Sequence, residues 1–237
     1  TYMTFKYISI KKLMIQSYKR KHKLEKKYDT IVIGSGIGGL TAAALLAKEG
    51  EKVLILERHY TAGGFTHVFK RKGYEWDVGI HYIGEVQRPN SAIKKIFDYV
   101  TNGKLEWADM GDVYDRIIIG KKTYDFVKGV DNFQKKIFEY FPVEKEAIKK
   151  YIELIFLSNK SMGKFYSAKA LPAIVNFFMG RRMRKDYLKY ADQTTQEVLE
   201  SITDNQELIK VLTGQYGDYG LPPRQSSFAM HASVVKH

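Results

Sequence analysis

The stretch that decides the fold is YDTIVIGSGIGGLTAAALLAKEGEKVLILER, residues 28–58. Its first part, Thr30–Ile33, is a short apolar run rich in β-branched residues and predicts a buried strand. Residues 40–48 are rich in alanine and leucine, contain no proline and predict a helix. Residues 52–56 predict a second buried strand, which ends on Glu57. The stretch therefore predicts a βαβ unit.

Glycines in the pattern G-x-G-x-x-G join the first predicted strand to the helix. Gly34 allows a tight turn, Gly36 lets the backbone approach a pyrophosphate, and Gly39 lets the helix pack close to the strand. The free amides and the positive dipole end of the helix are suited to hold phosphate groups. The candidate binding loop comprises Gly34, Ser35, Gly36, Ile37, Gly38 and Gly39.

An acidic residue completes this pattern at the end of the second predicted strand. Glu57 is placed to accept hydrogen bonds from a ribose hydroxyl, and its charge would repel a 2′-phosphate, which disfavours NADP. The strand, the helix, the second strand and the acid about 20 residues on are the context that the glycine motif requires. A turn between strand and helix that binds no ligand is the alternative. We interpret the stretch as a dinucleotide site.

Composition limits the class of protein. At 237 residues, the chain has enough material for one large domain or two small ones. It contains no cysteine, which excludes disulfides, thiolate metal sites and cysteine catalysis and fits a reducing compartment. No apolar run approaches the ~18–20 residues that span a bilayer, and lysines interrupt the first residues where a secretory leader would lie. We expect a cytoplasmic protein, with peripheral membrane contact as a possible addition.

The net charge of +13 is concentrated in two segments. Residues 1–27 hold nine Lys and Arg against one acid, and residues 160–190 hold eight against one. One interpretation of the first segment is a basic amphipathic arm that lies on a membrane surface. The alternatives are a disordered tail or an incorrectly assigned start of the chain. The remainder of the chain has a small negative charge, so the predicted nucleotide domain is not basic.

The second basic segment surrounds the apolar and aromatic residues 171–179. This composition is typical of an interfacial anchor on anionic lipid, although a buried helix with a solvated basic end has it too. No recognised nucleic-acid-binding motif is present, so nucleic acid is a poorer explanation of the charge.

A second glycine pair, Gly63 and Gly64, follows the acid closely and suggests backbone that lies against the cofactor, with an ordinary turn as the alternative.

Residues 68–72 and 74–78 predict short strands around Gly73. The rest of the chain predicts an antiparallel hairpin of residues 114–119 and 123–127, and helices over residues 91–100 (capped by Ser91), 130–140, 143–162, 197–212 and from 228 onward, with a loop at 216–227.

The segments GSGIGGL, VLILERHYTAGGF and YEWDVGIHYIG together resemble the FAD-dependent phytoene desaturase and carotenoid isomerase superfamily. GIHYIG and the final LTGQYGDYGLPPRQSSFAMHASVVKH most resemble its retinol saturase branch. The resemblance runs from residue 28 to 237 and is strongest at its two ends. It implies that the glycine loop and the acid bind the ADP half of FAD, and that the glycine pair and the D-x-G turn lie along the flavin. Carried over to this sequence, the additional cofactor residues are Arg58, Gly63, Gly64, Phe65, Asp77 and Gly79.

The resemblance also implies the organisation of the chain. We expect an α/β fold, with a Rossmann-like FAD/NAD(P)-binding domain and an inserted α+β region that faces substrate and membrane. Residues 28–90 would form the binding core, after the arm of residues 1–27, and residues 91–237 an incomplete part of the substrate domain. Family members are roughly twice as long by this resemblance, so we expect a truncated chain with exposed apolar surface.

The function that the resemblance implies is FAD-dependent oxidoreduction at carbon–carbon double bonds of a polyene or isoprenoid lipid. His81 and Tyr82 lie between glycines beside the expected cofactor and are candidates to face flavin or substrate, although a structural histidine fits as well. The other histidines show no spacing that suggests a metal site. Alternatives are an amine-oxidase-like flavoenzyme, a non-catalytic nucleotide-binding module, and NAD in place of FAD. The substrate, the reaction direction, the electron donor and the oligomeric state stay open.

Overall fold

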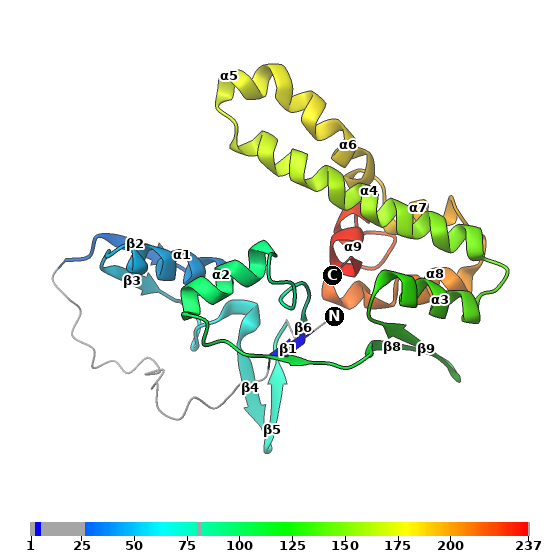
Figure 1. The fold of residues 1–237 in the computed structure, drawn as a ribbon, viewed down its shortest axis with the longest axis horizontal. Helices are drawn as coiled ribbons and strands as arrows, with labels where there is room; N and C mark the ends of the chain where they lie inside the picture. The colour runs from blue at the N-terminus through cyan, green and yellow to red at the C-terminus, as the bar shows by residue number, and fades with distance from the viewer. Residues whose placement is uncertain (1–2, 6–26, 80–81, 237) are drawn as a thin grey trace. The chain divides into compact units, whose positions relative to one another are not determined.

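The computed structural model describes residues 3–5, 27–79 and 82–236, so the N-terminal arm lies almost wholly outside the described residues. The chain divides into two compact units (Figure 1): unit 1, Thr1–Met110, and unit 2, Gly111–His237. Each unit is described by itself.

Unit 1 contains the predicted βαβ unit. Strand β2 (Thr30–Ile33) pairs in parallel with β3 (Val53–Leu56), and helix α1 (Ile37–Lys48) connects them. The register sets Thr30 opposite Val53 and Ile33 opposite Leu56. A parallel pair needs a crossover connection, and the alanine-rich sequence of α1 forms it as a helix. The βαβ prediction is confirmed.

The prediction that both strands are buried was wrong for one face of β2. The side chains of Ile31 and Ile33 are 58% and 86% exposed, whereas Val32 on the opposite face points toward Gly39 of α1. Successive side chains of a strand point to opposite faces, and among the described residues α1 covers one face of this pair. Apolar surface on the other face is therefore exposed, as the sequence analysis expected for some part of the chain.

Helix α2 (Ala92–Thr101) also belongs to unit 1. Ser91 caps its first turn by accepting a hydrogen bond from the Lys94 amide, as predicted. The ammonium of Lys48 on α1 donates to the Asn102 side chain at the end of α2 and lies 4.5 Å from the centre of the Tyr99 ring. Helix α2 therefore packs on α1 within unit 1, which ends at residue 110.

The other strands of unit 1 are short. After a 3₁₀ turn (Gly64–Thr66), the two predicted short strands, β4 (Val68–Arg71) and β5 (Tyr74–Asp77), pair as an antiparallel hairpin. Its two-residue turn, Lys72 and Gly73, has positive φ at both residues, which matches the twist of a tight hairpin. A separate antiparallel sheet has the strand order β6 (Tyr82–Ile83), β1 (Met3–Phe5), β7 (Trp107–Asp109).

Unit 2 begins with the predicted hairpin, β8 (Val113–Ile119) and β9 (Lys122–Val127), followed by helices α3 (Val130–Tyr140) and α4 (Lys145–Ala170). α3 matches its predicted range, and α4 extends eight residues beyond the predicted end at 162. Side chains of the hairpin and of α3, α4 and the C-terminal helices form one core, for example Phe126, Ile137, Ile148, Leu199 and Phe228.

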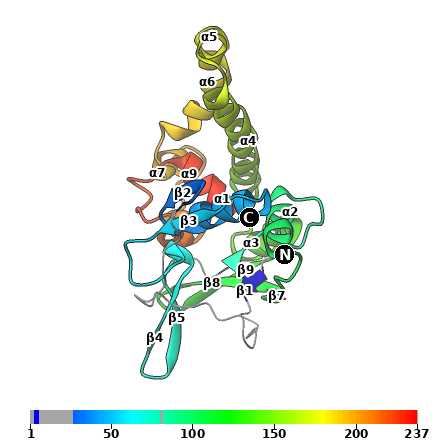
Figure 2. The ribbon, with the colours of Figure 1, turned by 90° about the vertical axis from the view of Figure 1, so that its left-hand side faces the viewer.

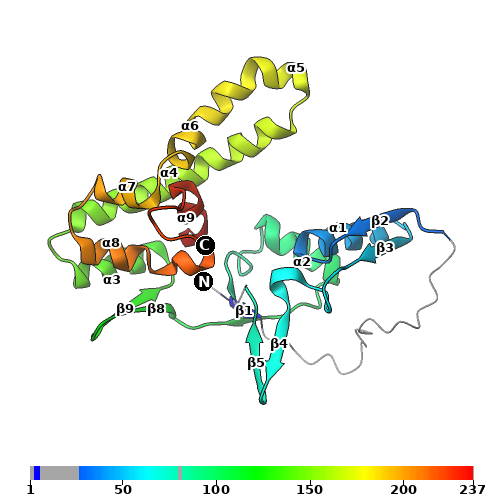
Figure 3. The ribbon, with the colours of Figure 1, turned by 180° about the vertical axis from the view of Figure 1, so that it is seen from behind.

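Helix α4 forms a helical hairpin with the chain that follows it. A short helix α5 (Ala173–Val175), a π-helical turn η2 (Asn176–Gly180) and helix α6 (Arg181–Ala191) lead back along α4. The end that carries α5 projects from the rest of unit 2 in three views (Figures 1, 2 and 3).

The remaining helices of unit 2 are α7 (Thr195–Glu200), α8 (Gln206–Leu212), the 3₁₀ turn η3 (Gly214–Asp218) and α9 (Phe228–Val235). The prediction of one helix over residues 197–212 was wrong, because the chain leaves the helix after Glu200 and starts again after Asn205. Across the described ranges 3–5, 27–79 and 82–236, no helix is both long and apolar enough to cross a membrane.

Candidate functional site

The glycine loop of unit 1 has the geometry that its spacing predicts. Gly34 has φ of +96°, a conformation that suits glycine. Gly36 is the N-cap of α1, and a Cβ at Gly39 would lie 2.1 Å from the Gly34 carbonyl oxygen. Only glycine at position 39 lets α1 approach the strand this closely. The amides at the start of α1 point outward without helical partners, as in any α-helix.

The second glycine pair lies directly against this loop. The Gly63 amide donates to the Ser35 carbonyl over 3.0 Å, and Gly36 and Gly63 form a parallel β-bridge. A Cβ at Gly64 would come within 2.9 Å of the Gly36 Cα. The two glycine segments, nearly thirty residues apart in sequence, are therefore one structural feature.

Glu57 also reaches this feature, through Ser35. One carboxylate oxygen accepts hydrogen bonds from the Ser35 amide at 2.7 Å and the Ser35 hydroxyl at 2.5 Å, and the other accepts from the His59 amide at 2.7 Å. These bonds, the Ser35 hydroxyl first, lower the pKa of Glu57 from 4.5 to about 2, so it is ionised at neutral pH. A carboxylate has about four acceptor positions, so Glu57 retains capacity for a ribose hydroxyl.

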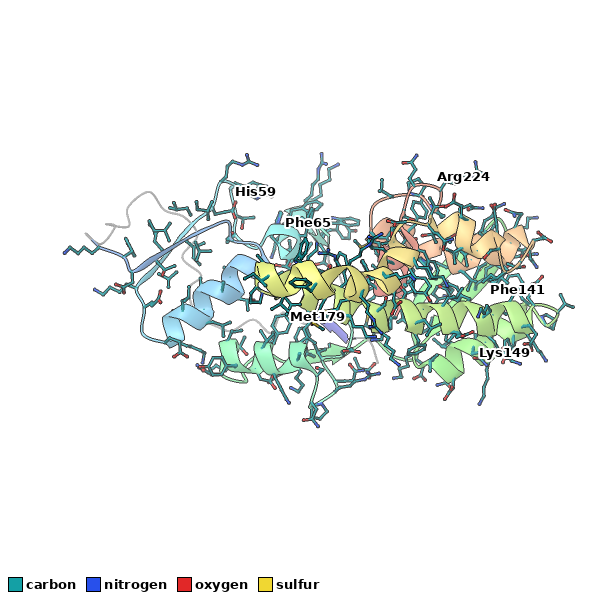
Figure 4. The ribbon with its side chains drawn as sticks, turned by 90° about the horizontal axis from the view of Figure 1, so that it is seen from above. His59, Phe65, Phe141, Lys149, Met179 and Arg224 are labelled. Atoms are coloured by element: carbon teal, nitrogen blue, oxygen red, sulfur yellow. The ribbon has the colours of Figure 1, made fainter. Side chains whose placement is uncertain are left out.

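Some of the other predicted site residues reach this feature and some do not. Phe65 follows the glycine pair and is 75% exposed, and a Cβ at Gly79 would lie 3.0 Å from the Phe65 Cβ, so Gly79 lies beside Phe65. Figure 4 labels Phe65 and His59 in this part of unit 1. Ile37 and Gly38 begin α1, and both are exposed.

The four remaining candidates are Asp77, Tyr82, His81 and Arg58. Asp77 ends β5 opposite Val68, and Tyr82 lies in β6 of the separate three-stranded sheet. His81 lies outside the described residues. The Arg58 side chain is exposed at the end of β3.

The contribution of the Ser35 side chain was not predicted from the sequence. Ser35 is 1% exposed. Its hydroxyl donates a hydrogen bond to Glu57 and accepts one from the Gly63 amide over 3.3 Å. A single hydroxyl thus joins the glycine loop, the acid and the second glycine pair. A small hydroxyl residue between the first two glycines, with an acid after the next strand, is the signal that would have indicated this contact.

The residues present fit the ADP half of a dinucleotide. A Cβ at Gly34, Gly36 or Gly38 would meet no atom within 4 Å, so the outer side of the loop has room for a bound group. α1 carries no acid in its first turn to repel phosphate. In the described part of the chain, no group of three or more His, Asp or Glu is placed to hold a metal ion.

This geometry defines the class of protein: unit 1 contains a Rossmann-like dinucleotide-binding fold. The family of NAD(P)-binding Rossmann-like domains matches residues 32–100, which extend from β2 through α2. The fold prediction is confirmed for this part of the chain.

Comparison with known sequences narrows the class of protein further. It is 36% identical over 223 residues to the all-trans-retinol 13,14-reductase of Danio rerio, covering 91% of this chain and 37% of that protein. It is 33% identical over 242 residues to a protein of the same organism named inactive all-trans-retinol 13,14-reductase, covering 95% and 40%. It is 34% identical over 140 residues to prolycopene isomerase 2 of an Oncidium hybrid, covering 53% and 22%. The chain belongs to the superfamily that these reductases and isomerases share, as the resemblance predicted.

A solved structure supports the fold and no more. A triple mutant of putrescine oxidase, made to redesign cofactor binding, has a TM-score of 0.53 and 16% identity, covering 88% of this chain and 41% of that one. At this identity the similarity shows the fold alone and does not favour an amine substrate. The chain spans 37% to 40% of the length of the reductase relatives described above.

Proposed function

We propose that this chain is the dinucleotide-binding part of an FAD-dependent oxidoreductase that acts on carbon–carbon double bonds of a polyene or isoprenoid lipid. The observation that carries the proposal is the convergence of the glycine loop, Glu57 and the second glycine pair in a chain whose relatives act on retinol and prolycopene. FAD is preferred to NAD because the relatives belong to a superfamily that the sequence analysis identified as flavin-dependent.

The residues divide the task of holding the cofactor. The amides at the start of α1 would bind the pyrophosphate, and Glu57 would accept from the adenosine ribose while Ser35 holds its orientation. Gly63 and Gly64, which lie against the loop, together with Phe65 and the adjacent Gly79, would line the side toward the flavin. When bound, FAD supplies hydride chemistry at a double bond, and the protein supplies position and exclusion of water. Tyr82 and His81 stay candidates to face flavin or substrate.

The proposal includes peripheral contact with a membrane. A long apolar polyene partitions into lipid, so an enzyme that uses it benefits from a surface that rests on the bilayer. Residues 160–190, with eight basic residues and one acid around an apolar segment, are the part of the chain suited to this contact.

The test is an anaerobic assay of the protein as the cell makes it, loaded with FAD, reduced chemically and mixed with all-trans-retinol or prolycopene. We expect the polyene absorption to change at a rate proportional to bound FAD, with products identified by mass. Ser35→Ala should raise the concentration of FAD needed for half-saturation by about tenfold, because a hydrogen bond to a charged group is lost. No polyene conversion by the FAD-loaded protein, with either substrate and either redox state, would contradict the proposal.

A further inference from the structure

The far end of the α4–α6 hairpin exposes an unusual concentration of apolar side chains. Ile174, Phe177, Phe178 and Met179 are 76%, 81%, 76% and 56% exposed. The Phe177 and Phe178 rings lie 5.2 Å apart at nearly a right angle, and Figure 4 labels Met179 on the same turn. We call residues 173–179 the tip. Large apolar side chains gathered on one surface mark a site of interaction.

The tip is held away from the core by the helices behind it. The first half of α4 contributes Ile148, Tyr151 and Ile155 to the core of unit 2, whereas its second half packs on α6. There, the Phe165 and Tyr187 rings lie 4.3 Å apart, and Ala168 and Gly180 are buried. With 26 residues, α4 is about 39 Å long. The hairpin thus has its own packing, and the exposed tip is not needed for it.

Cations surround the tip. Lys164 and Lys169 precede it on α4, Arg181, Arg182 and Lys185 follow it on α6, and all five residues are exposed. Arg184 is half-buried and lies 3.4 Å from the Asn176 side-chain oxygen within the π turn. The single acid of residues 160–190 is Asp186. An apolar end with a collar of positive charge matches the two layers of an anionic lipid surface, acyl chains beneath negative headgroups.

We propose that the tip inserts into the outer layer of an anionic phospholipid membrane, with Phe177 and Phe178 in the acyl region and Arg181 and Arg182 among the headgroups. The inference deepens the membrane contact in the proposed function by naming the inserted residues and the lipid charge. The geometry favours a membrane over a protein, because the tip is the projecting end of unit 2 (Figures 1 and 2) and the charges around it are predominantly positive. The insertion needs no cofactor, so its test is independent of the redox proposal.

The test is sedimentation of the 237-residue chain with two kinds of phosphatidylcholine vesicle, one with about 30% phosphatidylserine and one without it. We expect binding to the anionic vesicles that weakens with salt. The double variant Phe177→Ser, Phe178→Ser should bind about 100-fold more weakly, because each ring contributes at least about tenfold when buried in an apolar phase. Arg181→Gln, Arg182→Gln should bind about tenfold more weakly, with the loss confined to anionic vesicles.

A matched control removes two exposed aromatic rings elsewhere. Tyr74 and Trp76, 69% and 54% exposed on the β4–β5 hairpin, become Ser in this variant, which should bind like the unaltered chain. Circular dichroism of every variant verifies that the helices persist.

Insertion depth can be read directly, because both tryptophans, Trp76 and Trp107, lie in unit 1. Phe178→Trp adds one at the tip while keeping an aromatic side chain. On anionic vesicles we expect its emission to shift to shorter wavelength and to be quenched by lipids brominated in the acyl chain, after subtraction of the signal of the unaltered chain.

Three results would overturn the inference. The unaltered chain would fail to sediment with anionic vesicles, the Phe177→Ser, Phe178→Ser variant would bind them as tightly as the unaltered chain, or brominated lipids would fail to quench the fluorescence of Trp introduced by Phe178→Trp. If the serine variant instead lowers the molecular mass in sedimentation without vesicles, the tip is covered by a second copy of the chain, and the membrane assignment is wrong.

Discussion

At the scale of single residues, the glycine loop depends on what each glycine touches. Gly38 and Gly39 are neighbours in α1, yet a Cβ at position 38 would meet open space and one at position 39 would overlap the Gly34 carbonyl. The spacing of the motif predicted the task of Gly39 correctly. The glycine spacing alone does not predict the link from Ser35 to Glu57, which needs the hydroxyl residue between the first two glycines to be considered together with the acid after the next strand.

This contrast gives a matched pair of variants. Gly39→Ala should destabilise unit 1 by about 2 kcal/mol, because α1 must move off the strand. Gly38→Ala should leave its stability unchanged or raise it by up to about 1 kcal/mol, since alanine is the better helix former. Urea unfolding followed by tryptophan fluorescence reports unit 1 alone, because both tryptophans lie there. Equal losses in the two variants would refute this account of the loop.

A buried histidine in unit 2 gives a second prediction at this scale. His231 has no exposed surface; its Nε2 lies 2.9 Å from the Tyr151 hydroxyl and its Nδ1 3.1 Å from the Tyr219 hydroxyl. Burial lowers the pKa of His231 from 6.5 to about 3 and raises the pKa of Tyr219 to about 12. A neutral ring donates through one nitrogen and accepts through the other, so two tyrosine hydroxyls satisfy it.

The sign of the pH effect follows from the lowered pKa. Below pH 6.5 the unfolded chain binds a proton at His231 that the folded chain does not, so stability is complete above that pH and falls as the pH drops toward 3. The slope is at most about 1.4 kcal/mol per pH unit. We expect the free energy of unfolding, measured by circular dichroism between pH 7 and 5, to fall more steeply for the unaltered chain than for His231→Gln. Parallel slopes would show that His231 does not carry the effect.

At the scale of elements, sequence patterns predicted the βαβ unit, α2 with its Ser91 cap, the two short strands around Gly73, the hairpin of residues 114–127 and α3. The predicted helix boundaries were wrong where a local polar contact ends or starts a helix within a continuous apolar pattern. The apolar spacing of residues 197–212 continues through a break, but Asn205 starts α8 by accepting hydrogen bonds from the amides of Glu207 and Leu208. Likewise, the apolar run of β2 could not reveal that one of its faces is uncovered, since burial on the second face depends on elements distant in sequence.

The cap can be tested by two substitutions at one position. Both Asn205→Ala and Asn205→Ser lose the amide contact to Glu144, but serine keeps an oxygen that can cap the helix. We expect Ala to be about 1 kcal/mol less stable than Ser in thermal unfolding of unit 2 followed by helical circular dichroism. If the two variants melt together, the helix start does not depend on this cap.

At the scale of the molecule, the two units differ in how much they bury. The large core cluster lies wholly in unit 2, whereas in the described part of unit 1 the buried apolar residues are Ala43 and Val86. A ligand that binds only the folded state stabilises it by mass action. We therefore expect a bound dinucleotide to stabilise the folded state of unit 1 in addition to its role in the chemistry. The sequence alone did not predict this effect.

The measurement that tests the central claim most directly is an absorption spectrum of the protein purified as the cell makes it, followed by release and identification of its cofactor. The account predicts a yellow protein with the two visible bands of an oxidised flavin, from which heat or acid releases FAD. A colourless protein that binds NAD and cannot be reconstituted with FAD would contradict it.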